Sequence, residues 1–424
     1  MTESEKKQEF NHEKYKENDS IRETHQLELR DLLKKCYQCA RCTGVCQISK
    51  VQNFRPSRII QKILEGFEDQ VLESGILWDC LMCNSCLQNC PEDINFADVV
   101  RVAKYKMINE YQQTPEDYIA HKGIYTLISE ITSNESIEPN RDLSWIPKEC
   151  KISDQGKILY HVGCIPFFKF EFDELNNIPV STIKMLSKIE KDPIVVLKNE
   201  YCCGHDLYWG QGKVDEFIKL AKKNIHNFEK SGISTIITTC AEGYRTFKID
   251  YPSIFDGFSE RFEVKHIIEY IYEKWQNGEI VFKPDKDLDK KLTFTFHDPC
   301  RISRFLPKTN EIMEKVREIF YHLEKQGFEF AEMKHNKSDS LCCGVSSWMN
   351  CNERSKALRY KRLLEAKEVG QMMITTCPKC ILHFSCLQND YDDISSIKIL
   401  DFTDFIINLV QINKKNKKGG SEEK

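Results

Sequence analysis

The sequence predicts a multidomain α+β protein in which a helical N-terminal domain precedes two duplicated α/β domains. Three observations predict this fold class: two runs of four cysteines in the N-terminal third, a unit of roughly 137 residues that occurs twice in the rest of the chain, and alternating strand-like and helical segments within each unit. The expected parts are a polar tail at 1–30, a first domain at 31–112, a linker at 113–155, a first repeat at 156–288, a second repeat at 289–412 and a tail at 413–424.

Cysteine is the outlying residue of the composition, with 20 in 424 residues. The first 30 residues are polar and contain no apolar signal segment, and the chain has no apolar run long enough to span a membrane. We therefore expect a cytoplasmic chain that would reach the inner face of a membrane only through a partner. In that reducing compartment, clustered cysteines are typical metal ligands or redox groups. A net charge of −4 gives no reason to expect a nucleic-acid partner.

Both N-terminal runs, CYQCARCTGVC (36–46) and CLMCNSCLQNCP (80–91), have the C-x2-C-x2-C-x3-C spacing of bacterial ferredoxins. Three closely spaced thiolates can bind one iron–sulfur cube, and the fourth reaches the other cube. This predicts two cubane [4Fe–4S] clusters, one on Cys36, Cys39, Cys42 and Cys90, the other on Cys80, Cys83, Cys86 and Cys46. Zinc, which C-x2-C pairs also bind, is the alternative. Gln47 replaces the proline that usually follows such a run, and we expect no consequence because that proline is not a ligand.

Helices are expected around these runs. In 55–74, apolar residues recur at helical spacing behind Pro56, which suits a helix start, and 95–111 has the same character. Two clusters wrapped by helices would accept and pass single electrons.

The duplication is visible in short matching segments. KILYHVGC (157–164) matches LTFTFHDPC (292–300), YCCGHD (201–206) matches LCCGVS (341–346), and STIITTC (234–240) matches QMMITTC (371–377). Apolar runs at 157–163, 193–197 and 235–239 predict strands, and amphipathic runs at 213–232, 310–327 and 353–370 predict helices. Strands that alternate with helices favour parallel sheets.

In parallel α/β sheets, sites form beyond the carboxyl ends of the strands, where the leading cysteine and the ITTC cysteine of each repeat lie. The second repeat would thus bring together five thiols, those of Cys300, Cys342, Cys343, Cys377 and Cys380. The first would bring together four, those of Cys164, Cys202, Cys203 and Cys240, since CAEG has Gly243 where CPKC has a second cysteine. Gly204 and Gly344, which follow the cysteine pairs, would allow positive φ or close backbone approach.

These residues resemble a known family, heterodisulfide reductase. CYQCARCTGVC, FRPSRIIQ and WDCLMCNSCLQNCP resemble its ferredoxin-type polypeptide, and the repeated C-x(n)-CCG-x(n)-C-x2-C unit resembles its CCG-domain polypeptide. Both parts on one chain resemble the fused polypeptide of the membrane-linked enzyme, and the resemblance covers roughly 31–410.

The resemblance implies a function and its cofactors. In that family the five-cysteine motif holds a noncubane [4Fe–4S] cluster, at which the coenzyme M–coenzyme B heterodisulfide of methanogenic archaea is split. Carried over, the five cysteines of the second repeat would be the catalytic ligands. The four of the first repeat would hold a further iron–sulfur cluster or line an empty relic.

The electron donor would be another polypeptide, either a flavoprotein or a membrane cytochrome b, because GQG (210–212) lacks the context of a dinucleotide site. We expect the chain to reduce, or in reverse to form, a disulfide of small thiols. The alternative is an electron-transfer component of a glycolate-, lactate- or glycerol-3-phosphate-oxidising flavoprotein that passes electrons to quinone.

The remaining candidates have plainer expected roles. Cys150, Cys351 and Cys386 are expected to be buried apolar thiols. His161 and His297, each three residues before a leading cysteine, are expected to hold structure or hydrogen-bond a cluster rather than donate a proton. For the basic residues beside the second site we favour solvation at the surface over binding of an anionic substrate; these are Arg301, Arg304 and Lys379.

Overall fold

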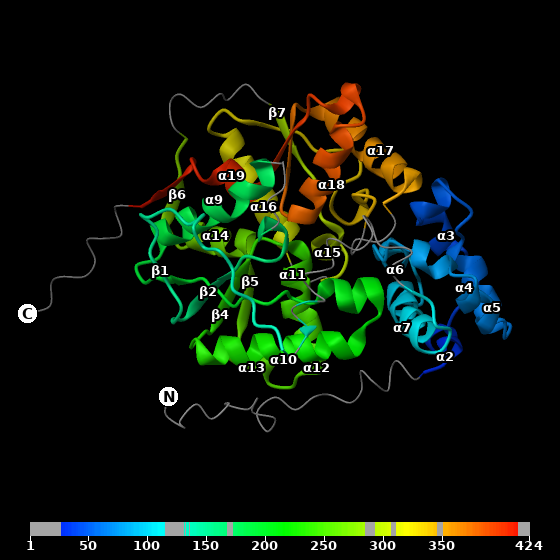
Figure 1. The fold of residues 1–424 in the computed structure, drawn as a ribbon. Helices are drawn as coiled ribbons and strands as arrows, with labels where there is room; N and C mark the ends of the chain where they lie inside the picture. The colour runs from blue at the N-terminus through cyan, green and yellow to red at the C-terminus, as the bar shows by residue number, and fades with distance from the viewer. Residues whose placement is uncertain are drawn as a thin grey trace, which may run out of the picture.

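A computed structural model describes residues 27–114, 131, 133–134, 136–167, 173–284, 293–306, 311–345 and 351–413. The predicted polar tails, the centre of the predicted linker and the predicted repeat boundary at 288/289 lie mostly or wholly outside these residues. Figure 1 shows a blue helical domain on the right. The green and the yellow-to-red α/β domains both lie on its left side.

The N-terminal domain is helical, as the sequence predicts. Its elements are α2 (Leu29–Leu33), α3 (Arg41–Val45), η1 (Ile48–Lys50), α4 (Pro56–Leu64), α5 (Glu68–Glu73), η2 (Ile76–Asp79), α6 (Ser85–Gln88) and α7 (Phe96–Asn109). The continuous helix expected over 55–74 is wrong. The chain breaks between α4 and α5 at Gly66, whose φ of 90° lies in the left-handed region, and Phe67 is left largely exposed.

The first α/β domain contains a five-stranded parallel sheet in the order β1-β3-β2-β4-β5. Its strands are β1 (Ile152–Ser153), β2 (Ile158–His161), β3 (Ile194–Val195), β4 (Thr235–Thr238) and β5 (Glu263–His266). Its helices are η5 (Ile165–Phe167), α9 (Asp173–Ile189), η6 (Asp206–Gln211), α10 (Val214–Lys230), α11 (Ala241–Arg245), η7 (Thr246–Asp250), α12 (Tyr251–Ile254), α13 (Phe258–Arg261) and α14 (Ile267–Gln276). The strand β1 comes from the stretch predicted as linker and extends the sheet beyond β3.

The second α/β domain repeats this plan with a four-stranded parallel sheet in the order β10-β9-β7-β8. Its strands are β7 (Thr293–Phe296), β8 (Glu329–Phe330), β9 (Met372–Thr375) and β10 (Lys398–Asp401). Its helices are α15 (Cys300–Ser303), α16 (Ile312–Glu324), η8 (Lys337–Asp339), α17 (Glu353–Val369), α18 (Pro378–Gln388), η9 (Asp392–Ile394) and α19 (Phe402–Ile406). Strand for strand, β8-β7-β9-β10 corresponds to β3-β2-β4-β5, so the duplication read from the sequence is also a duplication of topology.

The two α/β domains pack through corresponding elements. Helix α9 of the first packs on α19 of the second, and α16 of the second packs on α14 of the first. Thr182 and Thr403 share a hydrogen bond at one contact, and Trp275 meets His322 at the other. In addition, β6 (Ile280–Phe282) pairs antiparallel with β11 (Val410–Ile412), which joins the end of the first repeat to the end of the second. The packing of the two domains therefore has approximate two-fold symmetry. It brings the carboxyl ends of the strands in the two parallel sheets toward each other.

Candidate functional site

The two ferredoxin-type loops have the same backbone conformation. Gln38 and Ala40 in the first loop, and Met82 and Asn84 at the matching places in the second, all have positive φ, between 43° and 64°. Non-glycine residues seldom adopt this conformation, and such strain is concentrated at functional sites. The turns curl each loop so that its closely spaced cysteines face inward.

Each loop encloses a cavity that suits the ligand sets predicted from the sequence. Cys36, Cys39, Cys42, Cys86 and Cys90 line one cavity of about 30 Å³. Cys46, Cys80, Cys83 and Cys86 line another of about 30 Å³. Cys90 thus lies with the first run and Cys46 with the second, as the crossed ferredoxin pattern predicts. Burial raises the pKa of Cys42 to about 11 and that of Cys80 to about 12, so metal binding would have to displace their protons.

The second repeat brings its five predicted cysteines together at the ends of β7 and β9. Cys300 begins α15 directly after β7, Cys377 follows β9, and Cys380 lies in the first turn of α18. The thiols form a continuous series of hydrogen-bonded neighbours in the order Cys300, Cys342, Cys343, Cys380 and Cys377. Hydrogen bonds from Cys342 and Cys380 lower the pKa of Cys343 to about 6, so one thiolate is already stabilised by the protein.

The first repeat assembles its four cysteines in the same way. The thiols of Cys164 and Cys202 are hydrogen-bond neighbours, as are those of Cys202 and Cys203. Three of the four, those of Cys164, Cys203 and Cys240, line a cavity of about 20 Å³, close in size to the two ferredoxin cavities. The cavity is also lined by His161, His205, Asp206, Glu242 and Lys379.

The two cysteine sites adjoin across the domain interface. Cys240 of the first site is a hydrogen-bond neighbour of Cys377 of the second. Beside them, the ammonium group of Lys379 lies 2.6 Å from Asp206 Oδ1 and 2.5 Å from Glu242 Oε2, both in the first repeat. Glu242 and Lys379 hold the same place in their repeats, CAEG and CPKC, so the approximate symmetry brings opposite charges together.

The expectation that the basic residues beside the second site are solvated is wrong, because all three are buried. Lys379 is held by the two carboxylates, which raise the pKa of its ammonium group although burial opposes this. Arg301 donates to the carbonyl of Met82 at 3.0 Å, and Arg304 donates to that of Cys83 at 2.6 Å. The two arginines therefore attach the second ferredoxin loop to the second cysteine site and do not face solvent.

Gln47 also connects these two sites, which the sequence did not predict. Its side-chain oxygen accepts a hydrogen bond of 2.8 Å from the backbone N–H of Cys342, and its side-chain nitrogen donates to the carbonyl of Ser340 at 3.4 Å. Since Gln47 follows the predicted ligand Cys46, a short bonded path runs from one ferredoxin loop to the cysteine pair. The only signal in the sequence was that Gln47 stands where a proline usually follows such a run. The contacts of Gln47 could be recognised only in the tertiary structure.

Two family models match the chain in the regions just described. A 4Fe-4S dicluster domain matches residues 32–94, and a cysteine-rich domain matches twice, at 158–248 and 294–385, so that together they cover more than half of the chain. The chain therefore contains a 4Fe-4S dicluster domain followed by two cysteine-rich domains. It is an iron–sulfur oxidoreductase that is similar to a polypeptide of heterodisulfide reductase over most of its length.

The chain is similar to curated iron–sulfur proteins of more than one kind. The chain is 27% identical to the D polypeptide of the dihydromethanophenazine:CoB–CoM heterodisulfide reductase of Methanosarcina acetivorans, over 78% of this chain and 76% of the relative. It is 26% identical to the Methanosarcina mazei protein of that name, over 85% and 82%. It is also 23% identical to an EtfAB:quinone oxidoreductase of Syntrophomonas wolfei, over 73% of this chain but 43% of the relative.

The described part of this iron–sulfur protein holds no helix that meets the length and apolar content of a membrane span. Within the same residues, no three or more His, Cys, Asp or Glu side chains are gathered closely enough for one metal ion. A [4Fe–4S] cluster makes a different demand, since each of its irons takes a separate thiolate. The four-cysteine sets gathered around the ferredoxin cavities fit that demand.

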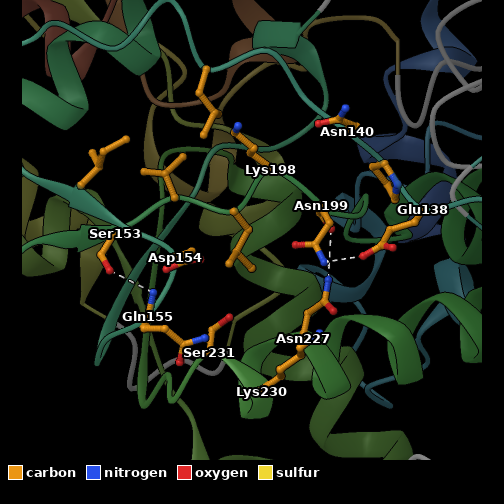
Figure 2. Close-up of a pocket in the computed structure, with 15 residues that line it drawn as sticks. Glu138, Asn140, Ser153, Asp154, Gln155, Lys198, Asn199, Asn227, Lys230 and Ser231 are labelled. Atoms are coloured by element: carbon orange, nitrogen blue, oxygen red, sulfur yellow. Dashed lines mark hydrogen bonds between the residues drawn. The ribbon is translucent and has the colours of Figure 1, made fainter. Parts of the chain in front are cut away.

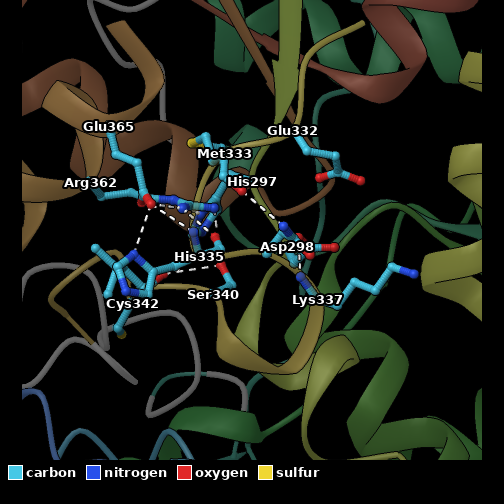
Figure 3. A network of polar contacts seen from close by, with 12 residues as sticks. His297, Asp298, Glu332, Met333, His335, Lys337, Ser340, Cys342, Arg362 and Glu365 are labelled. Carbon is cyan, nitrogen blue, oxygen red and sulfur yellow. Dashed lines mark hydrogen bonds and ion pairs between the residues drawn. The ribbon is translucent and has the colours of Figure 1, made fainter. Parts of the chain in front are cut away.

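A network of polar contacts holds the segments that lead to the cysteines of the second site (Figure 3). Arg362 donates to His297 Nδ1 at 3.1 Å, to Ser340 Oγ at 3.1 Å and to Glu365 at 2.7 Å. Asp298 accepts from the backbone N–H of Lys337 at 2.8 Å and from Arg317 at 2.9 Å. These bonds tie the segment before Cys300 to the segment before Cys342.

Both histidines have structural partners, as expected from the sequence. Burial lowers the pKa of His297, and the charge of Arg362 lowers it further, which keeps the ring neutral. His161 Nε2 lies 3.2 Å from the carbonyl of Tyr201, next to Cys202. The expectation for the three other cysteines is wrong, because Cys150, Cys351 and Cys386 are each only partly buried. Cys351 instead accepts a hydrogen bond from Arg359 at 3.5 Å.

A separate surface cavity lies at the edge of the first sheet, beside β1 and the end of α10 (Figure 2). Asn199 donates to Glu138 at 2.8 Å across it, and Asn227 donates to the carbonyl of Asn199 at 3.1 Å. Its lining includes no cysteine among the described residues, so it lies apart from the thiol sites.

Proposed function

We propose that this chain is the disulfide-reducing component of a larger complex. It takes electrons from a partner, a flavoprotein or a membrane cytochrome b, and uses them at the second cysteine-rich site to split a heterodisulfide of two small thiols, such as coenzyme M–coenzyme B. The single observation that supports this most is the direct attachment of the ferredoxin loops to the complete five-thiol site, through Gln47, Arg301 and Arg304.

The path of electrons follows from exposure and contact. Cys39 of the first ferredoxin loop is exposed, and the neighbouring Tyr37 is 59% exposed, so a donor can approach this end. The second loop is covered by the second cysteine-rich domain, whose Arg304 holds the carbonyl of Cys83. The expected order is donor, cluster of the first loop, cluster of the second loop, and the second cysteine-rich site.

The proposed cofactors are two cubane clusters in the ferredoxin domain and a noncubane cluster on Cys300, Cys342, Cys343, Cys377 and Cys380. When bound, these clusters supply one-electron transfer and a place for sulfur to bind. In the net reaction the S–S bond breaks, two electrons arrive from the donor, two protons are taken up, and two thiols leave. The reverse reaction would form the disulfide.

The protein's own residues prepare this site in two ways. The thiol hydrogen bonds that lower the pKa of Cys343, and those that lower the pKa of Cys377, favour the thiolates that bind iron. Burial of Cys342, Cys343, Cys377 and Cys380 excludes water, which strengthens the electrostatic interactions that hold charge at the site.

A second candidate function is supported by the relative that carries a quinone oxidoreductase name. In that case the chain would pass electrons from a flavoprotein toward quinone, and the cysteine-rich sites would be relay stations only. The complete C-x2-C of the second repeat favours disulfide chemistry. The altered first repeat, which lacks the second cysteine, favours the electron-transfer function.

Turnover with a defined disulfide separates the two functions. The protein is purified without oxygen, reduced viologen is supplied, and coenzyme M–coenzyme B heterodisulfide is added. We expect viologen oxidation with release of two thiols per disulfide, and its loss in Cys343→Ala. An intact, fully iron-loaded protein that leaves the disulfide untouched, yet reduces a soluble quinone, would support the relay instead.

A further inference from the structure

The first cysteine-rich site lacks one ligand but has not lost its cavity. Gly243 stands where the second repeat has Cys380. The site nevertheless keeps a small cavity of about 20 Å³, against about 30 Å³ for each of the two ferredoxin cavities. Protein interiors are close-packed, so a site without a ligand would be expected to fill with side chains. The retained cavity, lined by thiols and close in size to the ferredoxin cavities, favours a bound group over a packed core.

His205 supplies a donor atom in this cavity. The residue follows the CCG motif directly, lines the cavity and is only 1% exposed. Its Nδ1 lies 3.0 Å from Thr246 Oγ1, whereas its Nε2 is buried without a hydrogen-bond partner and lies 3.6 Å from Glu242 Oε1. With the proton on Nδ1, donated to Thr246, the Nε2 lone pair is free, which is the arrangement of most metal-binding histidines.

The second repeat provides an internal comparison. There the CCG motif is followed by Val345, and the fifth cysteine, Cys380, is present. The histidine therefore occurs in the copy that lacks the cysteine and is absent from the copy that keeps it. His161 also lines the first cavity, but its counterpart His297 occurs in the complete repeat, so His161 does not track the missing ligand.

We propose that His205 binds iron through Nε2 at the first cysteine-rich site, in place of the missing cysteine and together with the thiolates of that repeat. This inference rests on the proposal that the cysteine-rich sites hold iron–sulfur clusters. Glu242 is another donor nearby, but one of its oxygens is held by Lys379 at 2.5 Å, and Lys379 is also held by Asp206.

A histidine ligand would change the electronic character of the site. A neutral imidazole carries one negative charge less than a thiolate, and replacement of cysteine by histidine raises the reduction potential of iron–sulfur centres. The first site would therefore hold an electron more readily than an all-cysteine site. Because Cys240 adjoins Cys377, such an electron would rest beside the second site.

The test is nitrogen coupling in the paramagnetic protein. Full-length protein is made with ¹⁵N-labelled histidine, poised at a series of potentials and measured by pulsed EPR. We expect a directly bound ¹⁵N coupling that disappears in His205→Val, the residue of the second repeat, and remains in the control His161→Gln. His205→Cys should keep about sixteen irons per chain, lose the coupling and lower the potential of that signal.

Three results would overturn the proposal. One is a wild-type iron content of about twelve per chain, which means two cubanes and one further cluster. Another is a sixteen-iron protein without histidine coupling, and the third is a coupling lost in His161→Gln but kept in His205→Val. Disulfide turnover at the second site is measured on the same preparation. It tests the proposed function independently of the His205 proposal.

Discussion

At the scale of single residues, Gln47 joins the two chemistries of the chain. It accepts from the Cys342 N–H and donates to the Ser340 carbonyl, and it is 6% exposed. A buried N–H that loses its acceptor costs about 1 to 3 kcal/mol, so this contact matters for how firmly the cysteine pair is held.

We predict that Gln47→Leu slows electron transfer from the ferredoxin domain to the second site several-fold. The substitution leaves the Cys342 N–H without its acceptor and removes the bonded path. Reduction of the ferredoxin clusters by viologen should keep its wild-type rate, and rapid-mixing spectroscopy can follow both steps. Gln47→Glu keeps the acceptor oxygen and serves as the control; equal rates in all three proteins would contradict a role for this contact.

At this scale the predicted cysteine sets agree with where the structure places the thiols, whereas the predicted surroundings of the basic residues are wrong. The crossed ferredoxin pairing and the five-thiol set are spacing patterns, and the structure places those cysteines together. The burial of Arg301, Arg304 and Lys379 depends on which domain covers them, and a single sequence carries no signal for that.

At the scale of elements, the turns after the cysteine pairs require glycine. Gly344 has a φ of 81°, and a Cβ there would lie 2.4 Å from the carbonyl oxygen of Ser355 in α17. Gly204 has a φ of 86°, and its Cβ would lie 2.5 Å from the ring of Phe217 in α10. The sequence predicted either a positive φ or a close backbone approach to a cluster at these glycines. The structure shows the positive φ, together with close packing against a neighbouring helix that was not predicted.

Gly344→Ala is predicted to destabilise the second domain by about 2 kcal/mol or more, because it combines backbone strain with a clash against backbone. We expect a lower unfolding temperature and a loss of about four irons per chain, with the ferredoxin EPR signals retained. Gly44→Ala is the matched control, since no atom lies within 4 Å of a Cβ there. An unchanged iron content in Gly344→Ala would show that the turn tolerates a side chain.

The junction of β10 and α19 gives a pH-dependent prediction. Burial, with the nearby Asp404 carboxylate, raises the pKa of Asp401 to about 8, while its Oδ1 accepts from the N–H of Thr403 at 2.8 Å. The folded protein keeps a proton that the unfolded chain releases near pH 4, so this contribution to stability is lost as the pH rises through about 8.

Asp401→Asn keeps the cap without an ionisable group. Between about pH 6.5 and 8 the wild type should therefore lose roughly 1 to 2 kcal/mol of unfolding free energy that the Asp401→Asn variant does not lose. Thermal unfolding of both proteins across this range measures the difference. A constant offset would mean that Asp401 is ionised in the folded protein throughout.

At the scale of the whole molecule, duplication explains why the sites adjoin. Two equivalent contacts form across the interface, α9 on α19 and α16 on α14, and they direct both sets of strand ends inward. The sequence predicted the two copies and their parallel sheets. It did not predict that Cys240 would meet Cys377, or that Lys379 would be neutralised by the other copy, because nothing in the repeat itself fixes how two copies dock.

The attachment of the ferredoxin domain is predicted to depend on Arg304, which donates to Cys83, Ser338 and Ser340 carbonyls together. Arg304→Leu should keep the iron content but reduce disulfide turnover about tenfold or more. The second ferredoxin loop would then no longer be held against the second cysteine-rich site. Arg304→Lys should fall between, since an ammonium group cannot reproduce the planar fork. Turnover that stays at the wild-type level in Arg304→Leu would locate the electron path elsewhere.

The most direct measurement of the central claim is a single turnover followed by freeze-quench EPR. Fully reduced wild-type protein, without free donor, is mixed with heterodisulfide, and the signals of the ferredoxin clusters are followed. We predict that these clusters are reoxidised with release of two thiols, and that in Cys343→Ala they stay reduced while their own spectra are unchanged. Ferredoxin clusters that remain reduced in the wild type, or that are reoxidised equally fast in Cys343→Ala, would contradict disulfide cleavage at the second site.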